Sequence, residues 1–385
     1  MKLTELAQAQ ALRAIVELQP VDGPEGRIHP PTYPPAEGTR DTSPRHVVEE
    51  LPSGERRVLV DSVASQANRQ EAALVAAREA GLIDFADVYV ELADTEAGID
   101  RLSATEMPHR LADAILRDSE IDGVAFKNSG LGRRLLGTSL SDLSAILEAS
   151  PTSLLFGCWF SQHGQQRPLK IQRSTTSEIW AHNAVLGQAV GSRLDPLGIE
   201  KLHLYETPDG DWTALEEKAA QSKGKPKPFA KKRPSEINHG NIAPSIRHLG
   251  ITAERVTLRW AMPLAAIRRL RFGGGDRDAA GQAYVVALGV LARVLDHQAG
   301  YSLRSHCDLL GSGPLSIDVI DGDGAITTHA LTQEHAIGLL REGEEGLRHV
   351  GMAVHGKIVG KPSQKLTDLI KANKVAHELG GEAEE

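Results

Sequence analysis

Residues 56–69, RRVLVDSVASQANR, place a short apolar strand directly before a helix. Residues 58–60 form the apolar run, and Asp61 or Ser62 follows where the helix begins. Both residue types are good helix N-caps, because their side-chain oxygens accept hydrogen bonds from the unpaired N–H groups of the first turn. The stretch therefore predicts a strand followed by a capped helix that ends near Gly81.

One face of this helix is polar. At about 100° per residue, a single sector carries Ser62, Ser65, Gln66 and Arg69. Apolar side chains lie on a neighbouring face that can pack. The polar face sits at a helix N-terminus, where N–H groups and the helix dipole favour an anion such as phosphate. The alternative is a capped helix with a solvated polar face, and these residues alone leave both interpretations open.

The bulk composition indicates a globular protein of one large domain or two ordinary ones. The chain has 385 residues, 41% of them hydrophobic and 24% charged, with a formal net charge of −8. That charge argues against a protein that coats nucleic acid over its whole surface, but it allows a local basic groove. Aromatic residues make up 4%, so a nucleic-acid surface here cannot depend mainly on stacking.

The two cysteines, Cys158 and Cys307, are too few for a disulfide scaffold and form no zinc-ligand pattern. The N-terminal residues are amphipathic and lack the unbroken apolar core of a signal peptide, and no later stretch is expected to reach transmembrane length. We therefore expect free thiols, a cytoplasmic location and no membrane contact.

The rest of the chain mixes helical and strand patterns. We expect helices over 3–18, 111–118, 141–148, 278–297 and 333–346, and strands over 87–92, 153–160, 169–174, 255–262, 301–307 and 315–320, with a hairpin turn at 321–324. Residues 126–139 have loop composition with positive charge. This order predicts an α+β fold with a mixed or antiparallel sheet, and the split β-α-β pattern of ferredoxin-like folds is compatible with it.

Positive charge concentrates at residues 223–233, KGKPKPFAKKR, which contain no acid. Glycine and prolines there oppose a regular helix or a central strand, so we expect a mobile basic loop. A solubilising insertion is the alternative to a nucleic-acid contact.

Motifs for catalysis, metals and cofactors are missing. The glycine run FGGG at 272–275 fits neither a Walker A sequence nor a dinucleotide fingerprint, so it is either a phosphate cradle or a flexible turn. His329 and His335 lack the spacing of a helical zinc pair, and Cys158 lies in an apolar run. We expect no cofactor, no metal site and no enzymatic activity.

Several motifs, in order, resemble one family. HPPTYPP, VLVDSVASQANRQEAAL, MPHRLADAILRDS, FGCWFSQHG and GYSLRSHCDLL resemble the backbone RAMP subunit of CRISPR Cascade complexes of subtype I-U, now called I-G. The resemblance covers about residues 27–350. It implies a modified RNA-recognition-motif (ferredoxin-like) palm with thumb and finger insertions, for which 93–140 and 206–245 are the candidates. Residues 1–360 would form one RNA-binding domain, with a charged tail at 361–385.

The resemblance also implies a function. Copies of the subunit would polymerise head to tail along the guide RNA (crRNA) beside other Cascade subunits, and the guide would pair with target DNA. At matching positions, Ser62, Ser65, Gln66, Asn68 and Arg69 would contact guide phosphates. Further candidates rest on charge and position alone: Arg133, Arg134, Lys170, Arg173, Lys225, Lys231, Lys232, Arg233, Arg268, Arg269 and Arg271. Either FGGG or residues 311–313 would supply the family's glycine-rich loop.

Two other functions stay open. One is a RAMP ribonuclease that cuts target RNA with an acid and Mg²⁺, or processes the guide with a histidine such as His109 or His163. The other is a scaffold that needs no RNA.

Overall fold

The computed structural model describes residues 2–35, 45–161, 168–193, 195, 197–199, 201–237, 239 and 242–384. The chain divides into two compact units. The first comprises Met1–Ala184 and Ala253–Glu378, and the second comprises Val185–Thr252 and Leu379–Glu385. The fold is α+β, as expected.

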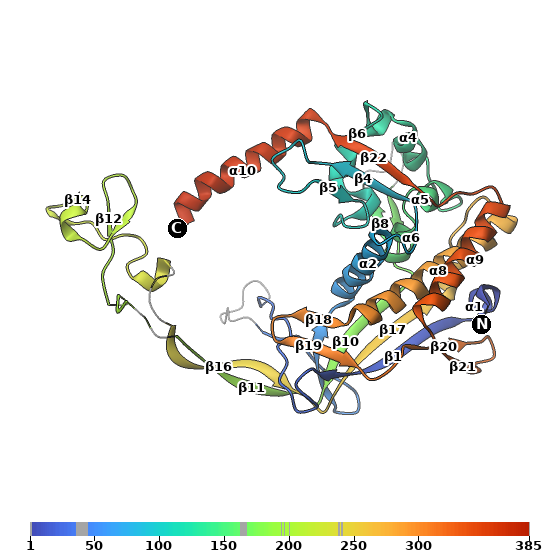
Figure 1. Cartoon of the computed structure of the whole chain (residues 1–385), viewed down its shortest axis with the longest axis horizontal. Helices are drawn as coiled ribbons and strands as arrows, with labels where there is room; N and C mark the ends of the chain where they lie inside the picture. Colours follow the sequence, from blue (N-terminus) through green and yellow to red (C-terminus); the bar gives the residue numbers. More distant parts are fainter. Residues whose placement is uncertain are drawn as a thin grey trace. The chain divides into compact units, whose positions relative to one another are not determined.

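An antiparallel sheet forms the centre of the first unit (Figure 1). Its strand order is β18 (Tyr301–Arg304), β19 (Cys307–Gly311), β1 (Ala11–Pro20), β17 (Arg255–Pro263), β10 (Thr176–His182), β3 (Arg56–Asp61) and β2 (Val48–Glu50). β20 (Ser316–Ile320) also pairs with β1 and continues into β21 (Ile326–Ala330), across the hairpin turn predicted at 321–324.

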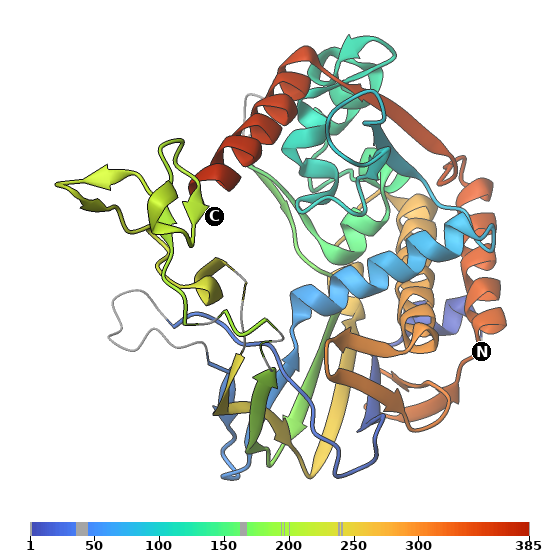
Figure 2. The ribbon, with the colours of Figure 1, turned by 60° about the vertical axis from the view of Figure 1, so that its left-hand side comes forward.

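Two helices give this sheet its connectivity. α2 (Val63–Glu79) lies between β1 and β10 in the chain, and α8 (Gly275–Ala299) lies between β17 and β19. The order β19-β1-β17-β10, with each neighbouring pair antiparallel, is the split β-α-β arrangement of ferredoxin-like folds. α2 packs on α8, and α8 packs on α9 (Gln333–His349) and on α1 (Leu3–Gln8) (Figures 1 and 2).

α8 supplies much of the core. Tyr284, Leu288 and Leu291 on this helix are fully buried, as are Trp260 and Met262 of β17. Within the described part of the chain, one helix is long and apolar enough to cross a membrane, and it is α8. Because 78% of its most apolar window is buried in the protein, a core position accounts for that composition.

The helix predicted for 3–18 is correct only over its first six residues. α1 ends at Gln8, and residues 11–20 form β1, a central strand. Leu12, Ala14 and Val16 are buried, whereas Ile15 is 52% exposed. This alternation has a period of two, which is typical of a strand with one open face.

A second sheet belongs to the same unit. Its order is β5 (Arg101–Ser103), β4 (Asp87–Glu91), β22 (Lys357–Pro362), β6 (Ser119–Ile121) and β7 (Val124–Ala125), and the β4–β22 pair is parallel. The helix predicted for 111–118 is interrupted. A 3₁₀ turn, η1 (Arg110–Ala112), precedes α3 (Ala114–Arg117), because the Asp113 carboxylate caps the Ile115 N–H and starts a new helix.

Residues 126–139 are not the expected loop. They form the 3₁₀ turn η2 (Phe126–Asn128) and α4 (Gly130–Leu136), which starts at Ser129 because the Ser129 hydroxyl oxygen accepts a hydrogen bond from the Gly132 N–H. α5 (Ser144–Ala149) follows close to its predicted place.

The strand predicted for 153–160 is also wrong. Residues 152–156 form α6 (Thr152–Phe156), and only β8 (Cys158–Phe160) is a strand. Gly157, with φ of +85°, separates the two elements. β8 pairs with β9 (Leu169–Ile171), the predicted antiparallel neighbour, in a two-stranded sheet outside the central one. The other helices are α7 (Leu264–Ile267), in this unit, and α10 (Gln364–Glu384), which belongs to this unit as far as Glu378.

The second unit is an insertion between β10 and β17. The pair β11 (Val185–Arg193) and β16 (Ile242–Thr252) leads into small elements: β12 (Tyr205–Glu206), β13 (Trp212–Thr213), η3 (Glu216–Lys218), β14 (Gln221–Ser222), β15 (Lys225–Pro226) and η4 (Pro234–Ile237). The basic stretch 223–233 thus includes a short β14–β15 hairpin, since the glycine at 224 adopts the positive φ that its turn needs.

Candidate nucleic-acid interface

The start of α2 follows the prediction. Ser62 is the N-cap, and its hydroxyl oxygen accepts a hydrogen bond from the Ser65 N–H at 3.3 Å. Ser62 and Ser65 are half-buried, and Asn68 is exposed. These three polar side chains remain accessible on the first turns of the helix.

Asp61, just before the cap, is fully buried and binds three side chains. Arg69 Nε and Gln66 Nε2 donate to Oδ2 at 3.0 and 2.8 Å, and Arg304 Nη2 donates to Oδ1 at 2.9 Å. Asp61 therefore joins the end of β3 to α2 and to the β18–β19 turn.

Gln66 is part of the interior and not of an open polar face. Its Oε1 accepts from the Ser177 hydroxyl at 3.1 Å and from Arg293 Nη1 at 3.4 Å, and none of the side chain is exposed. A phosphate contact by this amide would have to break those bonds. Arg69, 27% exposed, also donates to the carbonyl of Leu303 at 2.7 Å, so most of its hydrogen-bonding capacity is used internally.

A buried ionic group supports this cluster from α8. Arg293 lies within 2.9 Å of Asp296 and donates to the Tyr301 hydroxyl at 3.1 Å. Burial raises the pKa of Asp296, and the Arg293 charge opposes that rise. Burial also raises the pKa of Tyr301 to about 12. The arrangement fixes where β18 begins relative to α2.

Several predicted cations have partners inside the protein. Arg268 donates to the carbonyl of Ala9 at 2.9 Å, Arg134 pairs with Glu148, and Arg271 pairs with Asp278 at 3.1 Å. By contrast, Arg133 and Arg269 are exposed and have no ion pair or side-chain hydrogen bond to the residues the structure describes.

The FGGG turn does not present an empty anion cradle. The Asp278 carboxylate already accepts hydrogen bonds from the backbone N–H groups of Phe272 and Gly274. Burial acts against this charge, but the two N–H groups and Arg271 hold the pKa of Asp278 below its usual value. The loop is thus closed by a carboxylate of the helix that it precedes.

β8 and β9 border a hollow of about 440 Å³. Trp159 and Lys170 stand directly opposite each other across the strand pair, and Trp159 is 57% exposed. The lining side chains are Pro108, His109, Arg110, Phe156, Cys158, Trp159, Lys170, Ile171, Gln172 and Arg173. Burial raises the pKa of the Cys158 thiol to about 12, so this group stays protonated and is not a nucleophile.

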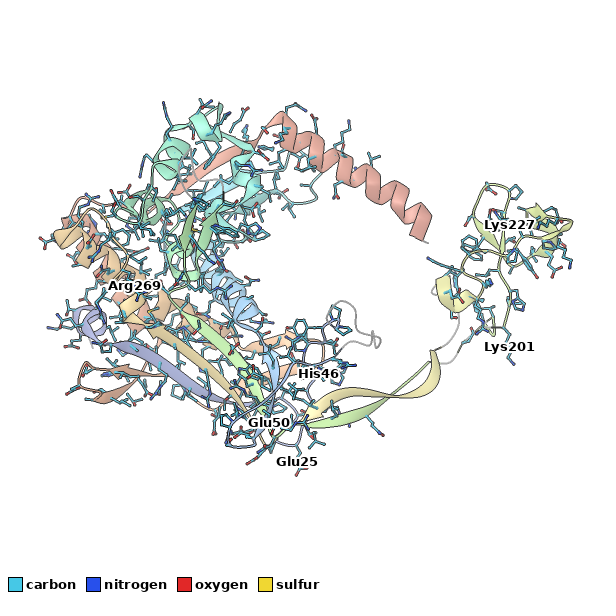
Figure 3. The ribbon with its side chains drawn as sticks, turned by 180° about the vertical axis from the view of Figure 1, so that it is seen from behind. Glu25, His46, Glu50, Lys201, Lys227 and Arg269 are labelled. Carbon is cyan, nitrogen blue, oxygen red and sulfur yellow. The ribbon has the colours of Figure 1, made fainter. Side chains whose placement is uncertain are left out.

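A second hollow, of about 250 Å³, shares the β9 wall. Lys170 and Arg173 line both hollows, and Arg269 joins them at the second, from the segment after α7 (Figure 3). The structure thus brings the predicted cation Arg269 beside Lys170 and Arg173, which lie about a hundred residues earlier in the chain. We call this group, Lys170, Arg173 and Arg269, the β9 basic cluster.

Two arginines beside the first hollow, Arg110 and Arg173, differ in whether an acid neutralises their charge. Both oxygens of the Glu71 carboxylate accept from Arg110, so the Arg110 charge is neutralised. Arg173 has no ion pair or hydrogen bond to the described part of the chain. Burial and the neighbouring Arg110 charge lower the pKa of Arg173, against the pull of Glu71. An added anion would relieve that repulsion.

The predicted cations of the second unit are on its surface. Lys225, Lys232 and Arg233 are exposed, and Lys231 is half-buried. Lys227, labelled in Figure 3, pairs with Glu206. Within this unit, the basic stretch is thus partly balanced by acid.

Sequence reasoning overlooked Trp159 as a surface residue, because it placed 153–160 in a central strand. The signal was Gly157, since a glycine between two apolar runs can end a helix and start a short strand. His109 lines the hollow, whereas His163 lies outside the described residues. The described residues contain no cluster of three or more potential metal ligands.

Residues 12–185 match the model of a family described as CRISPR-associated protein GSU0053. The chain is similar to CRISPR-associated proteins. The match supports the CRISPR-associated likeness seen in the motifs, over a stretch that runs from β1 to the first residue of β11. No curated protein matches the chain. One solved structure, "CRISPR RNA-guided surveillance complex, pre-nicking", aligns with a TM-score of 0.35 and 14% identity, covering 95% of this chain and 99% of that one.

Proposed function

We propose that the protein is a non-catalytic subunit that binds guide RNA in a CRISPR effector complex in the cytoplasm. Copies would associate head to tail along the guide, beside other Cascade subunits, and leave the bases free to pair with target DNA. The observation that supports this proposal most directly is the β9 basic cluster, whose three cations line two adjoining hollows. The CRISPR-associated family match supports the same conclusion.

The chemistry suits backbone contacts. Lysine and arginine side chains at hollows bind phosphates without reading sequence, and the Ser62, Ser65 and Asn68 side chains add hydrogen-bonding groups at a helix N-terminus. A few contacts per subunit become strong binding when many copies share one strand. The net charge of −8 keeps the rest of the surface from binding RNA indiscriminately.

The test is assembly on RNA of increasing length. Purified protein is mixed with single-stranded RNAs of several lengths, and mass photometry counts the copies bound at two salt concentrations. We expect the copy number to rise with RNA length and the affinity to fall steeply with salt. One copy on every length, or binding that ignores salt, would contradict the proposal.

The same samples separate a binding subunit from a ribonuclease. Labelled guide and complementary RNA are incubated with the protein and Mg²⁺. Intact RNA is expected. Specific cleavage that disappears in His109→Ala or in a single acid variant would establish the nuclease instead.

A further inference from the structure

The hollow beside β8 combines an exposed aromatic ring with two cations, Lys170 and Arg173, that form no ion pair with the described residues. Trp159 is 57% exposed, although indole rings are usually buried. Its side chain lines the open hollow beside β8 and β9. An exposed aromatic ring in a basic hollow is the usual arrangement for stacking a nucleobase.

The cation opposite the ring is loosely held. Lys170 Nζ lies 5.8 Å from the centroid of the Trp159 ring, near the outer limit of a cation–π contact. The ammonium group can therefore turn toward a phosphate at little cost. Arg173, on the same wall, has a guanidinium with no partner in the described chain.

The floor of the hollow is held rigidly by backbone and an ion pair. A Cβ on Gly157 would lie 2.9 Å from the Ile171 carbonyl oxygen, so β8 and β9 approach as closely as only glycine allows. Arg110 donates to the Gly157 carbonyl at 3.1 Å while it binds Glu71. This links the hollow to α2, the helix that carries the SVASQANR block.

We propose that this hollow is a subsite for one unpaired nucleotide of the bound RNA, with its base stacked on Trp159 and its phosphate on Lys170 and Arg173. The inference rests on the proposed function and adds a specific site to it: one base per subunit would leave the strand and occupy the hollow. Stacking is tolerant of base identity, so the site would accept any of the four bases.

The experiment is photo-crosslinking on the full chain. RNAs carry one 5-iodouridine at successive positions, and mass spectrometry identifies the linked residue after irradiation. We expect a link to Trp159 from a subset of positions. This measurement on the unaltered protein needs no variant, so it stands even where a substitution disturbs folding.

Variants then measure the contribution of the ring. Trp159→Ala should weaken RNA binding by on the order of tenfold and abolish the link, whereas Trp159→Phe should retain most of the affinity because it still stacks. Tyr33→Ala, which removes another exposed ring of the first unit, is the matched control and should bind as the unaltered protein does. Circular dichroism checks the fold of each variant.

The outcomes are distinguishable. RNA binding and assembly with no link to Trp159, or a Trp159→Ala protein that binds as tightly as the unaltered one, would overturn the subsite and leave the proposed function intact. Absence of RNA binding by the unaltered protein at every length would overturn both.

Discussion

The Gln66 amide donates a hydrogen bond to Asp61 Oδ2 at 2.8 Å, and neither side chain reaches solvent. Both residues belong to the stretch whose polar pattern most resembles an anion site. Their contact shows that part of this pattern holds the palm together, because the same carboxylate also binds Arg69 and Arg304. Ser62, Ser65 and Asn68 remain accessible for a ligand, whereas Arg69, 27% exposed, uses most of its hydrogen-bonding groups on internal partners.

Asp61→Ala should destabilise the protein by about 3 kcal/mol, because it leaves two arginines and an amide without their buried acceptor. Urea unfolding followed by circular dichroism measures the change. Glu79→Gln is the control, since its ion pair with Arg101 is about half-exposed on both sides and contributes about 0–1 kcal/mol. Equal effects of the two substitutions would show that the Asp61 cluster is not structural.

The Lys170→Ala/Arg173→Ala double variant should bind RNA more weakly and with a lower salt dependence. Each lost phosphate contact reduces the slope of log K against log salt by about 0.7 for a single strand. Fluorescence anisotropy over a salt series gives the slope. Arg117→Ala/Lys365→Ala removes two cations that both lie beside Asp118, so it matches the charge change and should keep the slope.

Gly157→Ala should destabilise the protein more than Gly54→Ala does. The two glycines have φ of +85° and +81°, so the cost of a positive φ is shared and is about 1 kcal/mol. A Cβ at Gly54 meets nothing within 4 Å, whereas one at Gly157 lies 2.9 Å from a backbone oxygen. The difference between the thermal unfolding midpoints of the two variants measures the cost of the Cβ clash at position 157. Similar midpoints would show that there is no such clash.

Asp87 should make stability depend on pH. Burial raises the pKa of this carboxyl to about 6, against hydrogen bonds from the Thr105 hydroxyl and the Val88 N–H, so the folded state holds a proton that the unfolded state releases. The contribution of Asp87 to stability is then highest below about pH 4 and falls as the pH rises to about 6.

The measurement for Asp87 compares Asp87→Asn with the unaltered protein across this range. Relative to the unaltered protein, the variant should gain up to roughly 3 kcal/mol between pH 4 and 7, since each pKa unit corresponds to about 1.4 kcal/mol. A difference in unfolding free energy that stays constant with pH would refute this reading of Asp87.

Elements with strong local signals were predictable from the sequence. The Ser62 cap and α2 followed from capping chemistry, and β17 and α8 followed from periodicity. The strand β1 was not predictable, because the apolar residues in 3–18 fit both a helical period and the alternation of a strand. Only the pairing of β1 with β17 and β19 decides between them, and those partners lie more than two hundred residues away.

The site was predictable in its residue types but not in its grouping. Charge alone placed Lys170, Arg173 and Arg269 on the same list as Arg268 and Arg271, although only the first three line the hollows. Arg268 hydrogen-bonds to the Ala9 carbonyl, and Gln66 hydrogen-bonds to the Ser177 hydroxyl. Both partners come from distant parts of the chain. Periodicity tells which residues share a helix face, but it does not reveal what that face will meet.

β1 has a consequence for synthesis on the ribosome. It leaves the exit tunnel more than two hundred residues before its neighbours β17, β19 and β20 do. At a translation rate of about 5–20 residues per second, the strand waits on the order of tens of seconds with both edges unpaired. During that time its exposed backbone groups are a template for other chains. The nascent protein is therefore vulnerable to aggregation until β17, β19 and β20 have been synthesised.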